Sequence, residues 1–494
     1  MIDLTKRPDT LRKNIAKARA QGIVVPTLAE LRNPELVPEG IRERLSKTGI
    51  FEIDPVNLFR ITWKNEPKEH GGLFGAPNFI ELPSRLTGVK ARIVAMAGKY
   101  FPTGCHKVGA SFGCLAPRLV TGQFDAADQR AVWPSTGNYC RGGAFNSKLL
   151  GVRGVAVLPQ GMSRERFDWL ESIGAEVIAT PGSESNVKEI FDKTAELKRD
   201  PGCMVFNQFE EMGNHLWHYS VTGNAMAEAF ALLKGNPAGR CGHRPLQLAG
   251  ACFTTGSAGT IAAGDRLKEL YPSIKIAVGE ALQCPTLLNN GFGEHRIEGI
   301  GDKHVPWIHN VRNTDMVIDI DDNDCFDLNR LFNDPAGLAF LAGELGLDAR
   351  TLKELSLLGI SGIANVLSCI KFAKYYELTE DDVVMTILTD SAEMYGSRRA
   401  ELAERDGDYT AQKAALDYAR HMECLKTDNM LELSYCDKKR IHNLKYYTWV
   451  EQQGKSVEEL NALWYDPDGT WGAVHRQADE IDALIREFNE AVMR

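Results

Sequence analysis

The sequence predicts an α/β fold in which parallel sheets are covered by helices on both faces. Two observations lead to this prediction. From about residue 90 onward, short apolar runs alternate with segments of helical periodicity, which is the pattern of buried parallel strands and their crossover helices. Loops rich in glycine and hydroxyl side chains also follow several of these runs, at the strand ends where α/β proteins bind ligands.

The predicted elements follow one another in a regular order. A charged helix over 10–21 comes first, and Trp63 and Phe74 are expected to anchor the segment after it. The expected strands are 92–100, a short run ending at 132–133, 154–159, 176–180, 203–207, 246–254, 275–280 and 383–388. The expected helices are 139–150, 163–173, 187–198 and 261–270, with Ser163 as a helix N-cap.

The character of the chain changes near both ends. Residues 1–88 are predicted to be an N-terminal extension, 89–396 the α/β core, and 397–494 a helical C-terminal extension rich in charged and aromatic residues. The chain closes with apolar residues at helical spacing: Ile481, Leu484, Ile485, Phe488 and Val492. Such a stripe predicts a face that docks on the rest of the protein rather than a catalytic element.

Composition narrows the functional class. A net charge of −9 over 494 residues argues against a nucleic-acid partner or an anionic membrane surface. The first twenty residues are charged throughout, which does not fit a signal peptide, and no apolar run approaches the ~18 residues of a membrane span. The 11 cysteines show no zinc-binding spacing, so we expect reduced thiols, no metal site and a cytoplasmic protein.

Lys107 lies in the segment Pro-Thr-Gly-Cys-His-Lys-Val-Gly-Ala-Ser at 102–111. This segment is a polar, glycine-containing turn after an apolar run. A lysine at the mouth of a sheet can form a Schiff base with a carbonyl cofactor. A single lysine, however, is more often a solvated surface charge, so the interpretation depends on the motifs that follow.

Two loops strengthen it. Ser135-Thr136-Gly137-Asn138 joins a strand to a helix, where backbone N–H groups bind anions, although a plain N-cap would explain the same residues. Gly256-Ser257-Ala258-Gly259-Thr260 also precedes a helix and would suit a phosphate group. The second loop is neither a Walker loop, because no lysine follows its last glycine, nor a GxGxxG fingerprint.

In order and spacing these motifs resemble the fold-type II pyridoxal-phosphate (PLP) enzymes, the tryptophan synthase β-like group. The cysteine synthase/cystathionine β-synthase branch is the most similar. The resemblance continues in Met-Ser-Arg-Glu-Arg at 162–166, Asn-Gln-Phe-Glu at 207–210, His-Arg-Ile-Glu-Gly-Ile-Gly at 295–301, Gly-Ile-Ser-Gly at 359–362 and Leu-Thr-Asp-Ser at 388–391. It covers about residues 90–396 and implies two α/β lobes with twisted parallel sheets, and PLP as cofactor.

The resemblance also implies a role for each matching residue. Lys107 would form the Schiff base and then remove the α-proton of the substrate. Asn138 would bind the phenolic oxygen of the cofactor, and Ser361 would face its pyridine nitrogen. The substrate carboxylate would be bound by Ser135, Thr136, Gly137 and Gln208, and the phosphate by Gly256, Ser257, Ala258, Gly259 and Thr260. A neutral hydroxyl at Ser361 would favour loss of a β-substituent over transamination.

The sequence departs from the branch at several positions. Ala258 stands where glycine is usual, and His106 before Lys107 is more similar to the threonine synthase and tryptophan synthase β groups. Relative to the branch, about ten residues are also inserted between 321 and 358. Tyr139 stands where a small Thr or a His is usual. Its phenol would be either an acid for the leaving group or a packed residue of the first helical turn, and both interpretations stay open.

The resemblance therefore implies β-elimination or β-replacement on a small serine- or cysteine-like amino acid, through an aminoacrylate. Ammonia-lyase chemistry of the dehydratase type is an alternative. A binding or regulatory subunit that keeps the PLP fold is an alternative from another class, and the intact Lys107 argues against it. The expected partners are a small amino-acid substrate and a second copy of the chain in a cytoplasmic homodimer, with no nucleic acid and no membrane.

Overall fold

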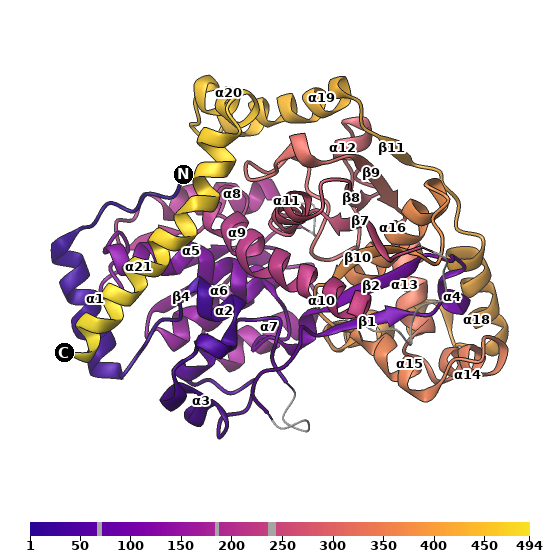
Figure 1. The fold of residues 1–494 in the computed structure, drawn as a ribbon, viewed down its shortest axis with the longest axis horizontal. Coiled ribbons are helices and arrows are strands. Elements are labelled where there is room, and N and C mark those ends of the chain that lie inside the picture. The colour runs from indigo at the N-terminus through magenta and orange to yellow at the C-terminus, as the bar shows by residue number, and fades with distance from the viewer. Residues whose placement is uncertain (67–71, 183–186, 236–243) are drawn as a thin grey trace.

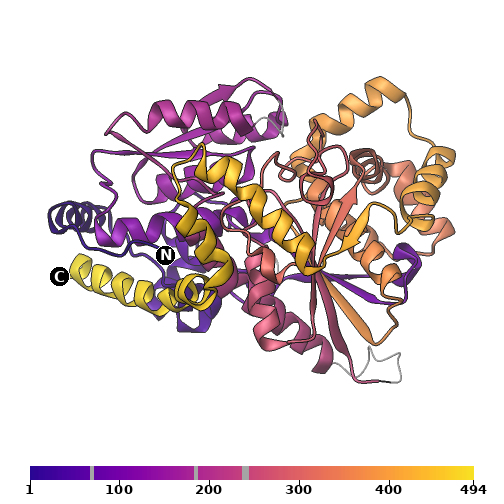
Figure 2. The same cartoon turned by 90° about the horizontal axis from the view of Figure 1, so that it is seen from above.

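The computed structural model describes residues 1–66, 72–182, 187–235 and 244–494. It consists of two neighbouring lobes, each built around one sheet (Figures 1 and 2). The larger sheet has the strand order β1-β2-β10-β7-β8-β9-β11 and the smaller one β5-β4-β3-β6. All pairs are parallel except β1 with β2 and β11 with β9. The predicted α/β class with parallel sheets is confirmed.

The strands are short, as expected for buried parallel sheets. They are β1 Phe79–Leu82, β2 Arg92–Ala97, β3 Arg130–Pro134, β4 Arg153–Pro159, β5 Glu176–Thr180, β6 Cys203–Val205, β7 Gln247–Thr254, β8 Lys275–Ala281, β9 Met316–Ile320, β10 Asp382–Leu388 and β11 Met430–Glu432. The strand expected over 92–100 stops at Ala97, because 98–100 form a 3₁₀ turn.

The helices of the N-terminal half are α1 Pro8–Gln21, α2 Leu28–Arg32, α3 Glu39–Leu45, α4 Ser84–Thr87, α5 Lys107–Thr121, α6 Asn138–Leu149, α7 Arg164–Ser172, α8 Val187–Leu197, α9 Met212–Trp217, α10 Gly223–Gly235 and α11 Ile261–Leu270. Those of the C-terminal half are α12 Thr286–Asn289, α13 Asp322–Leu331, α14 Pro335–Glu344, α15 Ala349–Glu354, α16 Ile360–Tyr375, α17 Gly396–Asp406, α18 Ala411–Tyr418, α19 Tyr435–Lys445, α20 Val457–Tyr465 and α21 Ala473–Met493.

Strand β2 shows how the larger sheet is buried on both faces. Its side chains alternate between the faces. Ile93 and Ala95 belong to a core cluster that contains the inner residues of α13 and α16. Val94 and Met96 belong to the other large cluster, which contains those of α10 and α11. Every second residue therefore packs on a different layer of helices, which explains why the strands are nearly continuous apolar runs.

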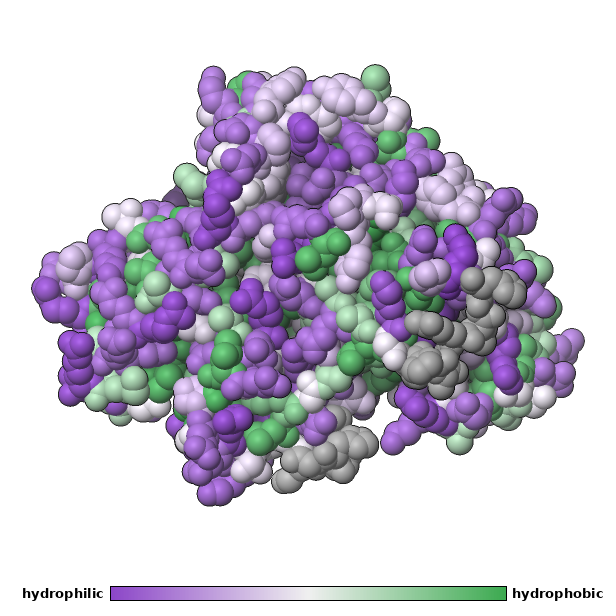
Figure 3. All heavy atoms as spheres, in the orientation of Figure 1, coloured by the Kyte–Doolittle hydropathy of each residue, from purple (hydrophilic) through white to green (hydrophobic). Residues whose placement is uncertain are grey.

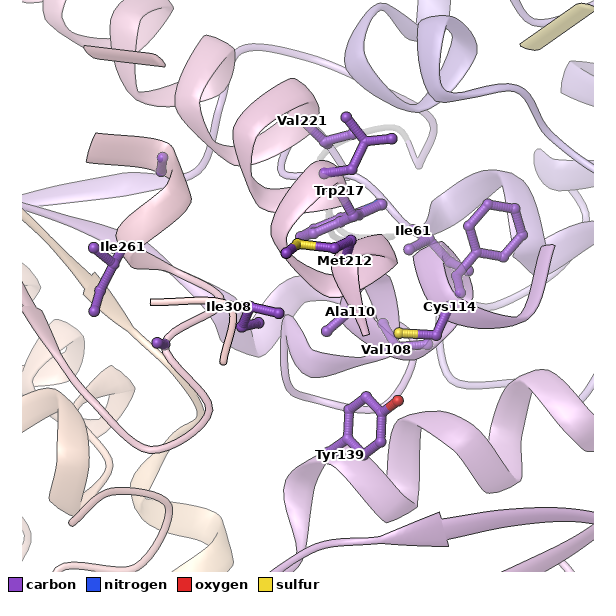
Figure 4. Packing of buried hydrophobic residues seen from close by; sticks show 14 of the residues in the cluster. Ile61, Val108, Ala110, Cys114, Tyr139, Met212, Trp217, Val221, Ile261 and Ile308 are labelled. Atoms are coloured by element: carbon purple, nitrogen blue, oxygen red, sulfur yellow. The ribbon is translucent and has the colours of Figure 1, made fainter. Parts of the chain in front are cut away.

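The smaller sheet follows the same rule. One face, with Trp133 and Leu158, packs on α5 and α6, and the other, with Val132 and Val155, packs on α8. Helix α5 also contacts α9, where Gly109 allows a close approach, since a Cβ atom there would lie 2.1 Å from the ring of Trp217. Figure 4 shows Trp217 above Val108 and Ala110 of α5. This packing fixes the helix that begins at Lys107.

Both edge strands of the larger sheet come from outside the predicted core 89–396. Strand β1 comes from the predicted N-terminal extension and β11 from the predicted C-terminal one. The two extensions also meet each other, because α21 packs beside α1 and α5 (Figure 1). The carboxylate of Asp482 on α21 accepts hydrogen bonds from the backbone N–H groups of Leu28 at 2.6 Å and Ala29 at 3.0 Å. Most of the apolar stripe of α21 is buried, as predicted for a docking face.

The described face of the molecule in Figure 3 carries mainly hydrophilic residues, with small and scattered apolar patches. No single helix among the described residues has the length and apolar character to span a membrane. Two consecutive helical segments, Ala349–Leu357 and Ile360–Tyr375, reach that length and composition only together, and they are bent by 113° where they meet.

Candidate active site

Lys107 is the first residue of α5, and its side chain reaches parts of the chain far away in sequence. The ammonium Nζ donates hydrogen bonds to Gln208 Oε1 at 3.1 Å and to Ser257 Oγ at 3.4 Å. Gln208 follows β6 of the smaller sheet, and Ser257 follows β7 of the larger one. Three residues that the sequence assigned to one site thus lie together at the junction of the lobes.

The loop 256–260 joins β7 to α11 and lies against neighbouring backbone. A Cβ atom on Gly256 would lie 2.6 Å from the carbonyl oxygen of Gly299, and one on Gly259 would lie 2.2 Å from Asn214 Oδ1. Asn214 Nδ2 in turn donates to Ser257 Oγ at 3.1 Å. At Gly256 a side chain would clash with backbone, and at Gly259 it would displace the side chain of Asn214, so the close approach expected from the sequence is built into this loop.

Ala258 has φ +65°, in the left-handed region. A residue with a Cβ atom pays roughly 1–2 kcal/mol there, so the departure from glycine in this loop stores backbone strain. Thr260 is the N-cap residue of α11. The N–H groups of Ile261, Ala262 and Ala263 donate to the carbonyls of Ala258, Gly259 and Thr260. The positive end of the α11 dipole therefore faces this loop, which suits an anion site.

Two buried hydroxyl groups near this loop lack a hydrogen-bond partner among the described residues: Ser361 Oγ and Thr255 Oγ1. Ser361 is the second residue of α16 and lies close to Gly299. Ser391, three residues after the end of β10, is a further buried hydroxyl side chain. Since buried polar groups are almost always satisfied in folded proteins, unpaired hydroxyls at one place indicate a position for a polar ligand.

The loop 135–138 is held in a shape that requires glycine. Gly137 has φ +144°, and its N–H donates to Ser135 Oγ at 3.0 Å. The carbonyl of Thr136 accepts a hydrogen bond from Arg166 at 3.3 Å. Asn138, the first residue of α6, points its amide into the lobe boundary, where Nδ2 donates to Asp390 Oδ2 at 2.7 Å.

A buried network of charges surrounds this bond, and no sequence motif indicated it. Arg166 pairs with Glu298 and lies 3.6 Å from Asp390, and all three side chains are at most 2% exposed. Tyr395 donates to Asp390 Oδ2 at 2.8 Å, and Arg398 Nε donates to Glu298 Oε1 at 2.8 Å. Burial raises the pKa of Asp390, and the charge of Arg166 opposes that shift.

Tyr139 lies in the core between α5 and α6 instead of beside Lys107. Its ring packs edge-on against Trp133, with centroids 5.6 Å apart, and its hydroxyl points toward Cys114 (Figure 4). The phenol is fully buried and has no hydrogen-bond partner among the described residues. Burial, and then the neighbouring Cys114, raise the pKa of Tyr139 well above its ordinary value. The structure favours the packing interpretation of this residue over the acid interpretation.

Asp302 is an acidic residue of the site that the sequence motifs did not single out. It follows Gly301, whose N–H donates to the carbonyl of Thr255 at 2.8 Å beside the glycine loop. The carboxyl is buried, and its Oδ2 has no hydrogen-bond partner among the described residues. Burial raises the pKa of Asp302 to about 7, although the positive charge of Lys107 opposes the shift.

The buried His106 next to Lys107 is kept neutral. Burial, reinforced by the charge of Lys107, lowers the pKa of its imidazole to about 3. The ring stacks on Trp63, which confirms the anchoring role predicted for that tryptophan. His106 thus adds no charge beside Lys107, and Asp302 is a nearby carboxyl whose pKa of about 7 allows proton exchange near neutral pH.

Comparison with known proteins gives a consistent picture. The family model "Pyridoxal-phosphate dependent enzyme" matches residues 78–390. A probable cysteine synthase from Bacillus subtilis is 30% identical over 314 residues, which are 63% of this chain and 91% of that protein. Cystathionine beta-synthase from Saccharomyces cerevisiae is 27% identical over 325 residues, which are 64% of this chain and 59% of that protein.

Two solved structures share the fold. The O-acetylserine dependent cystathionine beta-synthase from Helicobacter pylori has a TM-score of 0.54 at 24% identity and covers 65% of this chain and 95% of its own. A hydrogen sulfide-producing enzyme from Fusobacterium nucleatum has a TM-score of 0.53 at 22% identity. The match covers 64% of this chain and 95% of that one. Residues 391–494 lie outside the family match.

Proposed function

Because this chain belongs to the family of pyridoxal-phosphate dependent enzymes, we propose that it eliminates or replaces the β-substituent of a small serine- or cysteine-like amino acid. PLP is its cofactor, as in the rest of the family. The names of the relatives support the choice of reaction, since a cysteine synthase and a cystathionine beta-synthase are among them.

The residues around Lys107 fit this cofactor. The loop 256–260 offers N–H groups at a helix N-terminus and a backbone too close for side chains, which suits a phosphate. The hydroxyl of Ser361, which has no partner in the described part of the chain, suits a ring nitrogen, and the amine of Lys107 lies between the two lobes. When bound, PLP supplies an electron sink that makes the α-proton of an attached amino acid acidic.

The proposed roles follow from these positions. Lys107 Nζ holds the cofactor and then accepts the α-proton. Gln208 and Ser257 help to orient this amine. Ser135, Thr136, Gly137 and Gln208 bind the substrate carboxylate, and Gly256, Ser257, Ala258, Gly259 and Thr260 the phosphate. Asn138 contacts the cofactor after it exchanges its bond to Asp390. Asp302 Oδ2 holds a proton below about pH 7 and gives it to the leaving group.

The proposal assigns the chemistry to residues 89–396 and a docking role to the extensions 1–88 and 397–494. It includes a homodimer and a cytoplasmic location, and the free cysteines of the described residues support the second of these. Ammonia-lyase chemistry of the dehydratase type remains the second candidate, because a proton held by Asp302 would also help a hydroxyl group to leave.

The single observation that carries the proposal is the position of Lys107 Nζ, which contacts the smaller lobe through Gln208 and the loop after β7 through Ser257. The test incubates the PLP-loaded protein with O-acetylserine, serine, cysteine and threonine, with and without sulfide. Released acetate, sulfide, ammonia and keto acid are measured. Borohydride reduction followed by mass mapping locates the attached pyridoxyl group.

The expected result is consumption of a serine- or cysteine-like substrate and a pyridoxyl group on Lys107. Lys107→Ala should lose both, whereas the matched control Lys99→Ala should keep them, because Lys99 pairs with the exposed Glu393. Normal turnover by Lys107→Ala would refute the proposal. Consumption of threonine or serine with release of ammonia and a keto acid, but of no acetate or sulfide, would favour the lyase alternative. A labelled protein without any turnover would favour a binding or regulatory subunit.

A further inference from the structure

Glu298 lies between two arginines that come from different parts of the molecule. Its Oε2 pairs with Arg166 on α7 of the smaller lobe, and its Oε1 accepts from Arg398 Nε at 2.8 Å on α17. Arg398 belongs to the C-terminal extension, beyond residue 390, where the family match ends. The C-terminal extension therefore places a positive charge at the lobe boundary.

On one side this cluster holds the loop assigned to the substrate carboxylate. Arg166 Nη1 donates to the carbonyl of Thr136 at 3.3 Å. A Cβ atom on Gly137 would lie 2.4 Å from Arg166 Cδ, so the arginine stem lies directly on this glycine. The position of the guanidinium thus sets the orientation of the Thr136–Gly137 peptide group.

On the other side the cluster touches the loop assigned to the phosphate. Glu298 is followed by Gly299, whose carbonyl oxygen lies 2.6 Å from the Cβ position of Gly256. Two residues later, the N–H of Gly301 donates to the carbonyl of Thr255 at 2.8 Å. A shift of Glu298 therefore has to move backbone that packs against the glycine loop.

Arg398 contacts both lobes at once. Besides Glu298 of the larger lobe, its Nη2 donates to the carbonyl of Gly161 at 2.6 Å in the smaller lobe. Arg166 and Arg398 both face Glu298, Arg166 also lies 3.6 Å from Asp390, and Arg398 also pairs with Glu401 of its own helix at 3.0 Å. A cavity of about 290 Å³ lined by Met162, Glu298 and Arg398, among others, leaves this part of the boundary accessible.

We propose that Arg398 is a positioning residue through which the C-terminal extension supports substrate binding. With Arg166 it fixes Glu298, and Glu298 fixes the substrate loop at Thr136 relative to the phosphate loop at Gly256. The identity of the ligand, an amino acid with a free carboxylate, rests on the proposed function. The arrangement of Arg166, Glu298 and Arg398 does not depend on the proposed function.

The first test separates binding from chemistry. Arg398→Gln removes the charge that fixes Glu298, so KM for the amino acid should rise about 10- to 100-fold, as expected for a lost charge-assisted contact, with kcat within about threefold. Arg398→Lys should recover part of the affinity. The control is Arg405→Gln on the same helix, because Arg405 is half-exposed and pairs with its neighbour Asp406, and KM should not change.

The second test does not depend on turnover. Hydrogen exchange of the PLP-loaded protein should be faster in Arg398→Gln over residues 133–141, and unchanged in Arg405→Gln. If the wild type consumes none of the amino acids, the proposed function fails, and the exchange comparison still decides the role of Arg398. Equal exchange and equal KM in Arg398→Gln and Arg405→Gln would overturn the inference.

Discussion

The side-chain amide of Asn138 donates a hydrogen bond of 2.7 Å to the carboxylate of Asp390, and this bond joins the first turn of α6 in the smaller lobe to the end of β10 in the larger lobe. Tyr395 donates to the same carboxylate oxygen at 2.8 Å. In this arrangement Asn138 belongs to the contact between the lobes. Its assignment to the cofactor therefore requires an exchange of partners when the cofactor binds.

Asp390→Asn should destabilise the protein clearly. The variant leaves the buried Arg166 with one carboxylate partner fewer, and removing one member of a buried ion pair costs on the order of 3 kcal/mol or more. Urea unfolding at pH 7 measures the change in the free energy of unfolding. The control is Glu393→Gln, whose carboxylate is 69% exposed and pairs with Lys99, so its cost should stay below about 1 kcal/mol. Equal losses would show that the buried pair contributes no more than a surface pair.

Local sequence patterns predicted the regular elements well where the pattern was strong. Strand β5 and helix α11 have the bounds that were predicted for them, 176–180 and 261–270. Strand β9, Met316–Ile320, was missed because its apolar run is interrupted by Asp319, a carboxyl that the fold buries next to Glu280. The edge strands β1 and β11 were also missed, because each is short and contains a glutamate, Glu81 or Glu432, that breaks the apolar run.

In the candidate site, too, local features could be predicted from the sequence and features that depend on packing could not. Its loops could be predicted because glycine and hydroxyl residues before a helix have a local physical meaning. The charge network could not, because Arg166, Glu298 and Arg398 are far apart in the sequence and meet only after the lobes and the C-terminal extension have packed. The position of the Tyr139 side chain depends equally on the packing between α5 and α6.

Gly256→Ala should weaken retention of PLP. The new methyl group would lie 2.6 Å from a backbone carbonyl oxygen, so the loop has to move away from its place. Such strain typically costs about 1–3 kcal/mol, which corresponds to roughly a 5- to 150-fold weaker binding of the cofactor. Dialysis followed by absorbance of the remaining cofactor gives the measurement. Gly40→Ala is the matched control, because its surroundings are empty within 4 Å. Equal retention would place the phosphate elsewhere.

Tyr139→Phe should change neither rate nor stability by much. The hydroxyl is buried without a hydrogen-bond partner among the described residues, so its removal leaves no group unsatisfied and keeps the ring against Trp133. We expect a change in the free energy of unfolding below about 1.5 kcal/mol. Stopped-flow absorbance of β-substituent loss decides between the two interpretations, because loss of a general acid would slow the reaction by about 10²–10⁴-fold.

His421 should make stability depend on alkaline pH. Burial opposes its charged form, but hydrogen bonds to Asp324 and Asp327 outweigh that effect and raise the pKa of His421 to about 9. A pKa above the unfolded value of about 6.5 means that the stabilisation is complete below pH 6 and is lost as pH rises through 9. It amounts to roughly 3 kcal/mol at most. The gap in unfolding free energy between wild type and His421→Gln should therefore shrink between pH 6 and 10, and a constant gap would contradict the assignment.

Asp302→Asn provides the sharpest test of the chemistry, because activity and stability should change in opposite directions. The pKa of Asp302 is about 7 in the folded protein and about 3.9 in the unfolded chain. Between these values the unfolded chain releases a proton that the folded protein keeps. The wild type therefore loses stability as pH rises from about 4 to 7, by up to roughly 4 kcal/mol. Asparagine does not ionise, so the variant does not lose this stability as pH rises.

The variant should accordingly be at least as stable as the wild type at pH 8 by urea unfolding. If Asp302 Oδ2 delivers the proton to the leaving group, turnover should fall by about 10²–10⁴-fold, and the descending limb of kcat/KM near pH 7 should disappear, because the protonated form exists only below that pH. A purely structural carboxyl would leave the pH profile in place. Wild-type turnover together with an unchanged limb would show that Lys107 carries the protons without Asp302.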